Sequence, residues 1–542
     1  HTMSVAAMPP VKVRKVQEAT TVSHGDTPLA IGGPRPDLID AKLVGNHATA
    51  VLGAQFNSAT PFPHIHLRSF FSDPEFCKEL TEELLQEDFH LKSNDLYEFY
   101  QTAELNTPDL GCASPAASGS DETSAGGAAE AEAGSSAEAG TKRRREAKRL
   151  KQLRDLFVGK EFRDWLSAVS GVAKLTETVD MFGAVYNDGG YLLCHDDRLD
   201  TRRVAYILYL VPENWTYRNG GQLDLFGVER EGVPKAPAVR SLVPQLNSFA
   251  FFNVGVNSYH QVREVTGNLP RLTISGWFHG PPLELPTITR VVPHLQASPL
   301  RKRGVDLKAW INPRYLEEAT QAQVQEQFER DSNINLEDFL IASRFNAVKA
   351  QLPRVSWELR GPPMHTKHYG ASDVRTGNAA QELLAVLNSE EFAEVLRKMT
   401  DLDLKLCKGE LRRFGHGCYS LMSDEDPDRL EEGVDCILHL FGNVDAHQGH
   451  PGMGNGKAKE KANETDGEEE DAAEPQGWQD SWGGYMSYND EEGELISVWP
   501  QENALSLVYR VPGNSRFVKY VNHTAPQARH DAFLTFQEAP SE

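Results

Sequence analysis

His195, Asp197 and His260 are the residues whose types and spacing first indicate chemistry in this sequence. His195 and Asp197 are two residues apart, and residues i and i+2 of a β-strand point to the same face, so both side chains can reach one ion. His260, in the later segment 258–262, is the best candidate for a third ligand. Two histidines and one carboxylate form the facial triad that binds non-haem Fe(II). This ligand set leaves three positions open for a cosubstrate and O₂.

The His-x-Asp pair alone is a weak signal, because such pairs occur by chance and a single histidine near a strand is more often structural. The same ligands would also suit a zinc hydrolase. Arg271 favours the iron site, because a buried guanidinium there could bind the far end of a dicarboxylate. The alternative for Arg271 is a surface position at the start of a strand.

Short apolar runs between turn residues indicate the strands that would position these side chains. Such runs of this length are typical of a β-sandwich or barrel. The predicted strands are residues 191–193, 204–211, 222–226, 248–254 and 272–278.

Helices are predicted on both sides of this β-rich region. Ser72 and Asp73 precede Pro74, which is the pattern of a helix start. Apolar residues between Leu150 and Leu166 predict a helix with a basic beginning. Residues 300–400 look mainly helical, above all 316–328 and 379–402.

An internal repeat is the most informative feature of the organisation. The repeat predicts two β-barrel domains of one kind. His195 aligns with Ser423 and Asp197 with Glu425, so only the first copy keeps the metal ligands. The matching segments are 191–197 with 419–425, 204–210 with 434–440, 220–224 with 483–487, and 244–249 with 500–505.

Two segments of low complexity interrupt the domains. Residues 111–140 are small and polar, and residues 449–474 are acidic, so neither can bury enough apolar surface to become ordered. The basic run at 142–151 is either a nuclear localisation signal or a solvated helix face.

Composition limits the class of protein. The 542 residues suffice for two large domains. The net charge of −23 argues against a surface that binds nucleic acid directly, although it would attract a basic protein or simply aid solubility. No apolar run approaches the roughly 18 residues that span a bilayer. The six scattered cysteines form no disulfide framework, which favours a reducing compartment.

The order of His195, Asp197, His260 and Arg271 resembles the 2-oxoglutarate oxygenases with a double-stranded β-helix. Residues 186–191 resemble the segment that leads into this site in prolyl hydroxylases. Further segments resemble the ribosomal prolyl hydroxylases of the Tpa/Ofd type, and the resemblance runs from about residue 60 to 540. These segments are 193–197, 207–212, 275–281, 310–313 and 357–363.

The resemblance implies a mixed α/β (α+β) chain with two double-stranded β-helix (jelly-roll, cupin-like) domains flanked by helices, the second copy degenerate. We expect a disordered tail with a tag remnant at 1–45. A catalytic domain is expected at 46–290, with a flexible insertion at 111–145. A non-catalytic domain with a helical lead-in is expected at 291–542, with an acidic disordered insertion at 449–477.

The resemblance also implies the cofactors and their ligands. Fe(II) would be held by His195, Asp197 and His260, and 2-oxoglutarate would pair with Arg271 and accept a hydrogen bond from Tyr209. Tyr186 either lines the cosubstrate pocket or only packs there. O₂ would be the oxidant and ascorbate would support turnover. 2-Oxoglutarate would be converted to succinate and CO₂ as a proline is hydroxylated.

The substrate of the resembled family is a proline in the small-subunit ribosomal protein of the decoding centre. We therefore expect a peptidyl-proline 3-hydroxylase that affects translation accuracy and termination, with translation termination factors as further partners. Location in the nucleus and cytoplasm is expected, without a membrane. The alternatives are an oxygenase acting on another protein or on nucleic acid, or a binding scaffold without catalysis. Whether proline is hydroxylated once or twice stays open at this stage.

Overall fold

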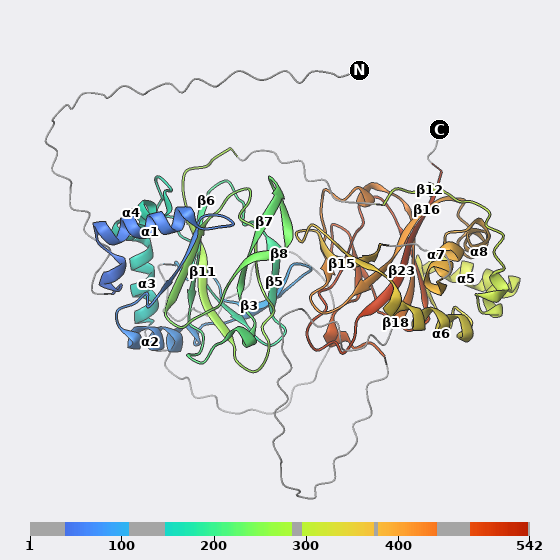
Figure 1. The fold of residues 1–542 in the computed structure, drawn as a ribbon, viewed down its shortest axis with the longest axis horizontal. Helices are drawn as coiled ribbons and strands as arrows, with labels where there is room; N and C mark the ends of the chain where they lie inside the picture. Colours follow the sequence, from blue (N-terminus) through green and yellow to red (C-terminus); the bar gives the residue numbers. More distant parts are fainter. Residues whose placement is uncertain (1–37, 108–146, 285–294, 373–377, 442–476, 540–542) are drawn as a thin grey trace, which may run out of the picture.

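The computed structural model describes residues 38–107, 147–284, 295–372, 378–441 and 477–539 (Figure 1). We call residues 38–284 the N-terminal half and residues 295–539 the C-terminal half. The insertion predicted at 111–145, the basic residues 142–145 and all but the last residue of the insertion at 449–477 lie outside the described residues. Most of the predicted tail, up to residue 37, lies outside them as well.

The N-terminal half is built on one antiparallel, nearly barrel-like sheet of eleven strands. The strand order is β1-β9-β6-β11-β4-β3-β5-β10-β7-β8, and β2 pairs with β3. The helices are α1 (Asn46–Ser58), α2 (Pro74–Leu84), α3 (Lys148–Val158) and α4 (Lys160–Ser170). The strands are β1 (His64–Arg68), β2 (His90–Ser93), β3 (Tyr97–Gln101), β4 (Phe182–Tyr186), β5 (Tyr191–His195), β6 (Arg202–Tyr209), β7 (Leu223–Arg230), β8 (Val233–Leu242), β9 (Ser248–Asn253), β10 (His260–Val262) and β11 (Arg271–His279).

Strand β9 shows why this sheet is buried on both faces. Phe249 and Phe251 point toward the helices, where the ring of Phe251 stacks on Phe56 of α1 with centroids 5.3 Å apart. Phe252 points the other way, because side chains alternate along a strand. Its ring lies 4.6 Å from that of His260. One face of the sheet therefore packs on helices while the other lines the interior that contains His260.

The C-terminal half has a nine-stranded sheet in the order β13-β21-β18-β23-β16-β15-β14, with β12 and β17 at its side, and a three-stranded sheet β20-β19-β22. The helices are α5 (Glu318–Asp331), α6 (Ala342–Gln351), α7 (Ala379–Leu387) and α8 (Glu390–Thr400). The strands are β12 (Ser298–Pro299), β13 (Asn333–Leu336), β14 (Trp357–Arg360), β15 (Thr366–Ala371), β16 (Leu404–Phe414), β17 (Tyr419–Ser420), β18 (Gly433–Phe441), β19 (Met486–Asn489), β20 (Glu494–Val498), β21 (Leu505–Arg510), β22 (Ser515–Val518) and β23 (Arg529–Glu538).

The helices lie at the two outer ends of the molecule and the sheets meet in the middle (Figure 1). At this junction the rings of Tyr191 and Tyr520 stack with centroids 4.3 Å apart. The Lys519 ammonium donates to the carbonyl of Asn94 at 2.7 Å and lies 3.1 Å from the carboxylate of Glu98. The two halves are thus joined by buried aromatic and charged contacts.

The predicted helix start at Pro74 is confirmed. The Asp73 carboxylate accepts a hydrogen bond from the Glu75 amide at 3.0 Å, which caps the first turn of α2. The predicted strands between 191 and 278 are confirmed as β5, β6, β7, β9 and β11. The broad prediction of a barrel-like sheet with flanking helices is therefore correct.

One helix prediction was wrong and another was incomplete. The apolar residues between Leu150 and Leu166 belong to two helices, because Gly159 takes an extended conformation and separates α3 from α4. Helices α5, α6, α7 and α8 are the main elements of the region 300–400, as predicted, but the prediction omitted strands β13, β14 and β15. These three strands are short and have partly exposed side chains, so their apolar pattern is weak.

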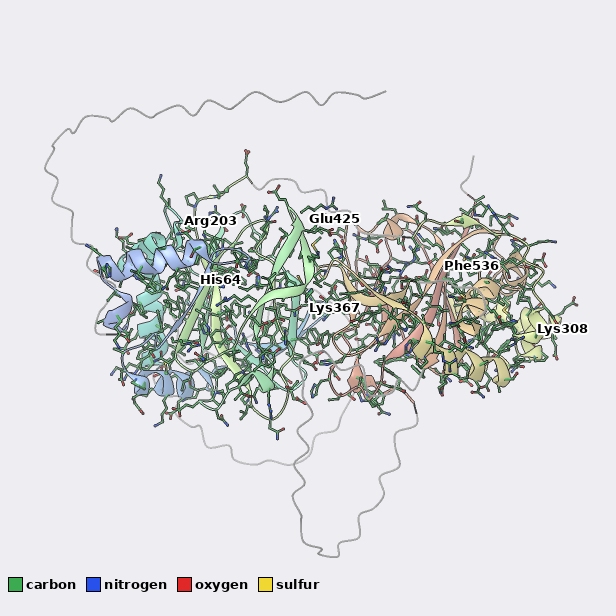
Figure 2. All side chains as sticks on the ribbon, in the orientation of Figure 1. His64, Arg203, Lys308, Lys367, Glu425 and Phe536 are labelled. Carbon is green, nitrogen blue, oxygen red and sulfur yellow. The ribbon has the colours of Figure 1, made fainter. Side chains whose placement is uncertain are left out.

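The described cysteines are free thiols and all are buried, as expected of a chain without a disulfide framework. They are Cys77, Cys194, Cys407, Cys418 and Cys436. Burial raises the pKa of Cys194 well above its usual value, and the nearby cation of Lys367 opposes this shift. Lys367 belongs to the C-terminal half and lies between the two sheets (Figure 2). Within the described ranges, no helix combines the length and apolarity needed to cross a membrane.

We predict that Phe249→Ala destabilises the N-terminal half by about 3–5 kcal/mol, because a fully buried ring is replaced by a cavity. Denaturant-dependent hydrogen exchange of the β6 and β9 amides measures this loss. Leu85→Ala is the control, since that side chain is 59% exposed. An equal effect of the two substitutions would contradict the packing described for β9.

Candidate metal and cosubstrate site

His195, Asp197 and His260 come together inside the N-terminal sheet. Strands β5 and β10 are hydrogen-bonded neighbours, and His195 lies directly opposite His260 in their register. The Asp197 carboxylate lies 3.3 Å from Nε2 of each histidine, one oxygen to each ring. One ligand atom from each residue lies within 4.8 Å of the others, so the three could hold one metal ion.

The conformation of Asp197 differs from the prediction. β5 ends at His195, and Asp197 has a left-handed backbone with φ of 60°. Asp tolerates this region better than most residues. The turn after β5, and not the alternation of a strand, therefore points the Asp197 carboxylate back toward His195.

Each histidine is oriented by a carbonyl of its own segment. Nδ1 of His195 lies 2.7 Å from the Leu193 carbonyl, and Nδ1 of His260 lies 2.8 Å from the Ser258 carbonyl. Since a carbonyl can only accept, Nδ1 carries the proton in each ring and donates it. Nε2 then presents a lone pair to the shared centre, as a metal ligand requires.

The electrostatics of the cluster favour a charged carboxylate. Burial alone would raise the pKa of Asp197, but His195 and His260 outweigh it and hold that pKa well below its usual range. Burial alone would lower the pKa of His195, but the negative charge of Asp197 outweighs it and raises that pKa. The Asp197 carboxylate is therefore charged, as a metal ligand requires.

Arg271 begins β11 and is 1% exposed. Its Nε donates to the Gly221 carbonyl at 2.8 Å, while its Nη2 is buried and has no hydrogen-bond partner in the described chain. The hydroxyl of Tyr209 is likewise buried and unpartnered there. Two unpaired buried donors are costly unless a ligand satisfies them.

Both predicted tyrosines flank this arginine. The guanidinium carbon lies 5.0 Å from the ring centroid of Tyr186 and 5.2 Å from that of Tyr209. Burial raises the pKa of both hydroxyls, while the positive charge of Arg271 opposes the rise. Both tyrosines therefore stay protonated, and Tyr209 keeps a hydrogen to donate. The structure thus places Tyr186 and Tyr209 against Arg271, and their roles toward a cosubstrate stay predictions.

The turn at Gly220 and Gly221 requires glycine. Both residues have positive φ, and a Cβ at Gly221 would lie 2.7 Å from Cδ of Arg271. A Cβ at Gly220 would lie 1.9 Å from the carbonyl oxygen of Glu264. The Gly-Gly pair thus allows the backbone to approach the arginine closely enough to accept its hydrogen bond.

Arg202 and Trp277 are two residues of the site that the sequence reasoning missed. The Arg202 guanidinium lies over the Trp277 ring, 3.4 Å from the centroid, and 4.0 Å from the Asp197 carboxylate. Arg202 Nε and Trp277 Nε1 are buried without a partner among the described residues. Strand alternation places Trp277 on the same face as Arg271, a signal that could have found it.

His66 of β1 was also missed. Its Nε2 lies 2.8 Å from the Ser248 hydroxyl, and its ring lies 5.5 Å from that of Tyr209. Burial, followed by the cations Arg68 and Arg240, lowers the pKa of His66 to about 4. His66 is therefore neutral at physiological pH. It contributes a polar, uncharged side chain to the interior beside Tyr209.

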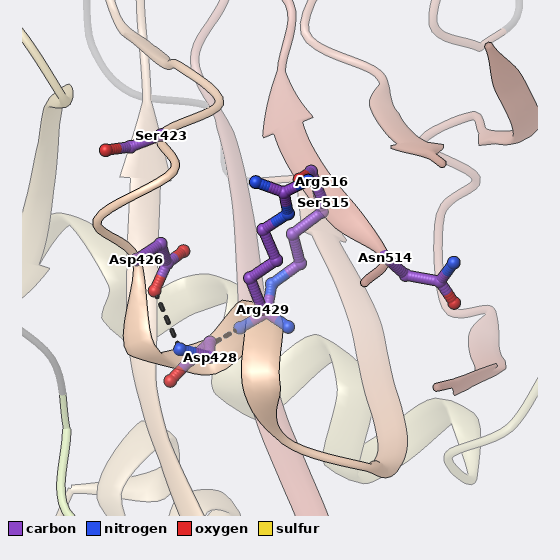
Figure 3. A pocket seen from close by; sticks show the side chains of 7 residues that line it. All are labelled: Ser423, Asp426, Asp428, Arg429, Asn514, Ser515 and Arg516. Atoms are coloured by element: carbon purple, nitrogen blue, oxygen red, sulfur yellow. Dashed lines mark hydrogen bonds and ion pairs between the residues drawn. The ribbon is translucent and has the colours of Figure 1, made fainter. Parts of the chain in front are cut away.

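A separate small hollow lies in the C-terminal half, between the side chains that Figure 3 shows. Its charged groups pair with each other, since Nη2 of Arg516 lies 2.5 Å from the Asp428 carboxylate. The residues that line it are Ser423, Asp426, Asp428, Arg429, Asn514, Ser515 and Arg516.

Comparison with known proteins identifies the family. The 2OG-Fe(II) oxygenase superfamily model matches residues 181–279, and a model described as the oxoglutarate and iron-dependent oxygenase degradation C-terminal domain matches 303–542. The chain is 34% identical over 532 residues to prolyl 3-hydroxylase OGFOD1 of Xenopus laevis, with 89% of each chain covered. The chain belongs to the prolyl 3-hydroxylase OGFOD1 family. The resemblance inferred from the sequence motifs is therefore confirmed.

Membership of the OGFOD1 family makes the chain an Fe(II)- and 2-oxoglutarate-dependent oxygenase that uses O₂. Another relative is prolyl 3,4-dihydroxylase OGFOD1 of Ostreococcus tauri, 28% identical over 87% of this chain and 94% of its own length. A solved prolyl-4-hydroxylase of Pseudomonas putida is 18% identical, with a TM-score of 0.28, and the match covers 42% of this chain and 99% of that one. The roles of individual residues stay predictions.

We predict that binding of Mn²⁺, a redox-stable substitute for Fe(II), weakens as the pH falls. The raised pKa of His195 means that a metal must displace a proton, which lowers the apparent affinity by about tenfold per pH unit below that pKa. Calorimetric titration of the metal-free protein between pH 8 and pH 5.5 measures the effect. An affinity that does not change over this range would contradict the assignment of His195 as a ligand.

Proposed function

We propose that this chain hydroxylates C3 of a proline in a protein substrate. The observation that carries the proposal is the pairing of a His-Asp-His cluster with a buried, unsatisfied arginine and tyrosine in one sheet interior. The relatives named prolyl 3-hydroxylase and prolyl 3,4-dihydroxylase support proline as the target. A second hydroxylation at C4 is a further possible outcome of the same reaction.

His195, Asp197 and His260 are the proposed Fe(II) ligands. The donor set fits, because two imidazole nitrogens and one carboxylate form a facial triad with three open positions. The carbonyls of Leu193 and Ser258 hold the two rings so that Nε2 of each faces the carboxylate. Little rearrangement is needed to bind the ion.

Arg271 and Tyr209 are the proposed anchors for the distal carboxylate of 2-oxoglutarate. The fit rests on their unpaired Nη2 and hydroxyl, since a carboxylate accepts from both donors at once. Tyr186 stacks on Phe99 with centroids 4.7 Å apart and closes one side of this pocket. The dicarboxylate would thus satisfy the two buried donors.

Fe(II) and 2-oxoglutarate together supply the oxidation of a C–H bond by O₂, with 2-oxoglutarate converted to succinate and CO₂. The chain orients the substrate proline and excludes water from the site. The Arg202 guanidinium lies 4.0 Å from the Asp197 carboxylate, and Arg202 Nε and Trp277 Nε1 are buried without a partner in the described chain, so a carbonyl of the substrate peptide would satisfy them. These donors would hold the target proline near the metal ligands, which is where orientation contributes most to the rate.

The decoding-centre protein of the small ribosomal subunit is the proposed substrate, with an effect on translation accuracy and termination. Such proteins are very basic, and the net charge of −23 supports electrostatic attraction. The proposal includes translation termination factors as partners, ascorbate as a support for turnover, and location in the nucleus and cytoplasm. The intact mass of this ribosomal protein after reaction tests the substrate: one added oxygen or two supports it, and none contradicts it.

We predict that His195→Ala lowers conversion of 2-oxoglutarate to succinate by about 100-fold or more, because a proposed metal ligand is lost. Succinate and hydroxylated peptide are both measured in the presence of Fe(II). His90→Ala, at an exposed position on β2, is the control and should keep full activity. Full turnover by His195→Ala would refute the assignment of the metal site.

We also propose that the C-terminal half, predicted as residues 291–542, is a second and non-catalytic copy of the catalytic domain predicted as 46–290. The order of elements supports this proposal. Strands β13, β21, β18, β23, β16, β15 and β14 neighbour one another in the order that β1, β9, β6, β11, β4, β3 and β2 take in the first sheet. The set β20-β19-β22 likewise parallels β8-β7-β10.

Backbone landmarks support one register between the proposed copies. Asn247 and Asn503 have φ of 55° and 56°, and their amides donate to the carbonyls of Tyr209 and His439 respectively. Tyr209 pairs with Thr273 and His439 pairs with Asp531. Arg271 lies two residues before Thr273, and Arg529 lies two residues before Asp531. Arg529 therefore corresponds to Arg271.

The same comparison supports a counterpart of the metal site in the C-terminal half. Val262 lies opposite Leu223, and Val518 lies opposite Met486, two residues after each Gly-Gly pair. His260 lies two residues before Val262, and Arg516 lies two residues before Val518, so Arg516 corresponds to His260. Ser423, the predicted counterpart of His195, lines the same hollow as Arg516 (Figure 3). This hollow is thus the proposed vestige of the metal site.

Side chains of the C-terminal half replace the ligands that it would otherwise bind. The Arg516 guanidinium lies 3.0 Å from the Asp435 carboxylate and 2.5 Å from that of Asp428, so a protein cation takes the place of a metal. Arg529 Nη2 donates to Asp531 at 2.9 Å, and Arg412 Nε donates to it at 2.7 Å. The Asp531 carboxylate thus takes the place of a bound dicarboxylate.

We predict that Asp531→Ala destabilises the C-terminal half by about 3–5 kcal/mol, because two buried arginines lose their shared carboxylate. Added formate should restore part of this stability by entering the space that the side chain leaves. Denaturant unfolding followed by exchange of the β18 and β23 amides measures both effects. The control is Glu425→Ala, at an exposed position, and equal responses of the two variants would contradict the proposal.

A further inference from the structure

Glu264 is a buried carboxylate of the N-terminal half whose hydrogen-bond donors come from the C-terminal half. It is 2% exposed. His416 Nε2 lies 2.6 Å from its carboxylate, the Tyr520 hydroxyl donates at 3.2 Å, and the His523 amide donates at 3.0 Å. His523 Nδ1 lies 2.9 Å from the same carboxylate.

These contacts hold the carboxylate in its charged form. Burial alone would raise the pKa of Glu264, but His416 and His523 outweigh it and lower that pKa. A buried charge is stable only while its partners remain, because losing one partner leaves the charge uncompensated. Glu264 is therefore fixed in position by residues that follow it by more than a hundred positions in the chain.

Two hydrogen bonds connect Glu264 to the proposed cosubstrate anchor. The Gly221 amide donates to the Glu264 carbonyl at 3.1 Å, and the Gly221 carbonyl accepts from Arg271 Nε at 2.8 Å. The neighbouring residue, Val265, exchanges hydrogen bonds with Gly189 and Gly190 just before β5. The segment after β10 thus supports both the turn behind Arg271 and the entry to the strand of His195.

A second contact reaches the same entry segment. His523 Nε2 lies 3.3 Å from the Asp188 carboxylate, next to Gly189. His523 therefore contacts both the segment after β10 and the segment before β5. One residue of the C-terminal half touches both backbone segments that shape the predicted site.

We propose that Glu264 is a positioning residue for 2-oxoglutarate, through which His416, Tyr520 and His523 hold the Gly220–Gly221 turn in place behind Arg271. The C-terminal half thus completes the cosubstrate site without touching the cosubstrate. The inference rests on the proposed role of Arg271 as the carboxylate anchor. The C-terminal half would then have a specific role in cosubstrate binding, in addition to packing against the N-terminal half.

Asp95 provides a matched control. It lies in the turn between β2 and β3, is 8% exposed, and accepts a hydrogen bond from the Met422 amide of the C-terminal half at 2.9 Å. Asp95→Asn and Glu264→Gln each remove one buried carboxylate charge from the junction without changing the size of the side chain. Only Glu264 has the backbone connection to Gly221 and Arg271.

The test measures the dissociation constant of 2-oxoglutarate for the full-length, Mn²⁺-loaded protein by calorimetry, together with hydrogen exchange at Gly221. We expect Glu264→Gln to weaken 2-oxoglutarate binding by about tenfold, a coupling of ordinary size. Exchange at Gly221 should become faster, while Mn²⁺ affinity changes by less than about twofold. In turnover, KM for 2-oxoglutarate should rise with little change in kcat.

Asp95→Asn should change 2-oxoglutarate affinity by less than about twofold, although it weakens the same junction. Equal effects of Asp95→Asn and Glu264→Gln would overturn the proposal, because a general loosening of the junction would then explain both. Unchanged affinity in folded Glu264→Gln would overturn it as well.

If Glu264→Gln does not fold, His416→Ala is used in its place. This substitution removes one hydrogen-bond donor to Glu264 at a half-exposed position. It should weaken 2-oxoglutarate binding by a smaller factor, and an unchanged affinity would count against the proposal. Arg271→Ala separates the role proposed for Arg271 from the role proposed for Glu264. If Arg271→Ala keeps full 2-oxoglutarate affinity, the proposed function of Arg271 fails. If only Arg271→Ala loses affinity, the role of Glu264 fails and that of Arg271 stands.

Discussion

His195 and His260 face each other across the β5–β10 pair, and the rest of the site depends on this one register. A shift of one residue would turn one imidazole to the opposite face of the sheet, because side chains alternate along a strand. The sheet keeps the register by continuing through β10 to β7 and through β5 to β3, so neither histidine strand is an edge. The helices pack on the outer face of the sheet, and the site residues lie on its inner face.

The sequence located most of the site and only part of its geometry. His195, His260 and Arg271 were found from ligand type, spacing and family resemblance, and the apolar runs located the central strands. The left-handed turn at Asp197 was missed because a strand and a turn can bring the same carboxylate to the same ion. Strand β8 was missed because several of its side chains are exposed and its apolar pattern is weak.

Long-range contacts were beyond the reach of sequence spacing. Glu264 lies in a segment with no ligand motif, and its partners His416 and His523 follow in the other half of the chain. Trp277 was hidden in a run read only as a strand, although alternation from Arg271 would have pointed it into the interior. The repeat aligned Ser423 with His195, but it did not cover Arg516, the proposed counterpart of His260.

The order of Glu264 and its partners along the chain has a consequence for biosynthesis. During translation the N-terminal half leaves the ribosome first, and such domains fold as they emerge. All proposed ligands for the metal and the cosubstrate precede residue 280, yet the last group that holds Glu264 belongs to His523. On the proposed role of Glu264, a nascent chain would carry every ligand residue long before it could bind cosubstrate at full strength. Cosubstrate affinity would then reach its full value only after His523 has folded against Glu264, although every ligand residue is already present.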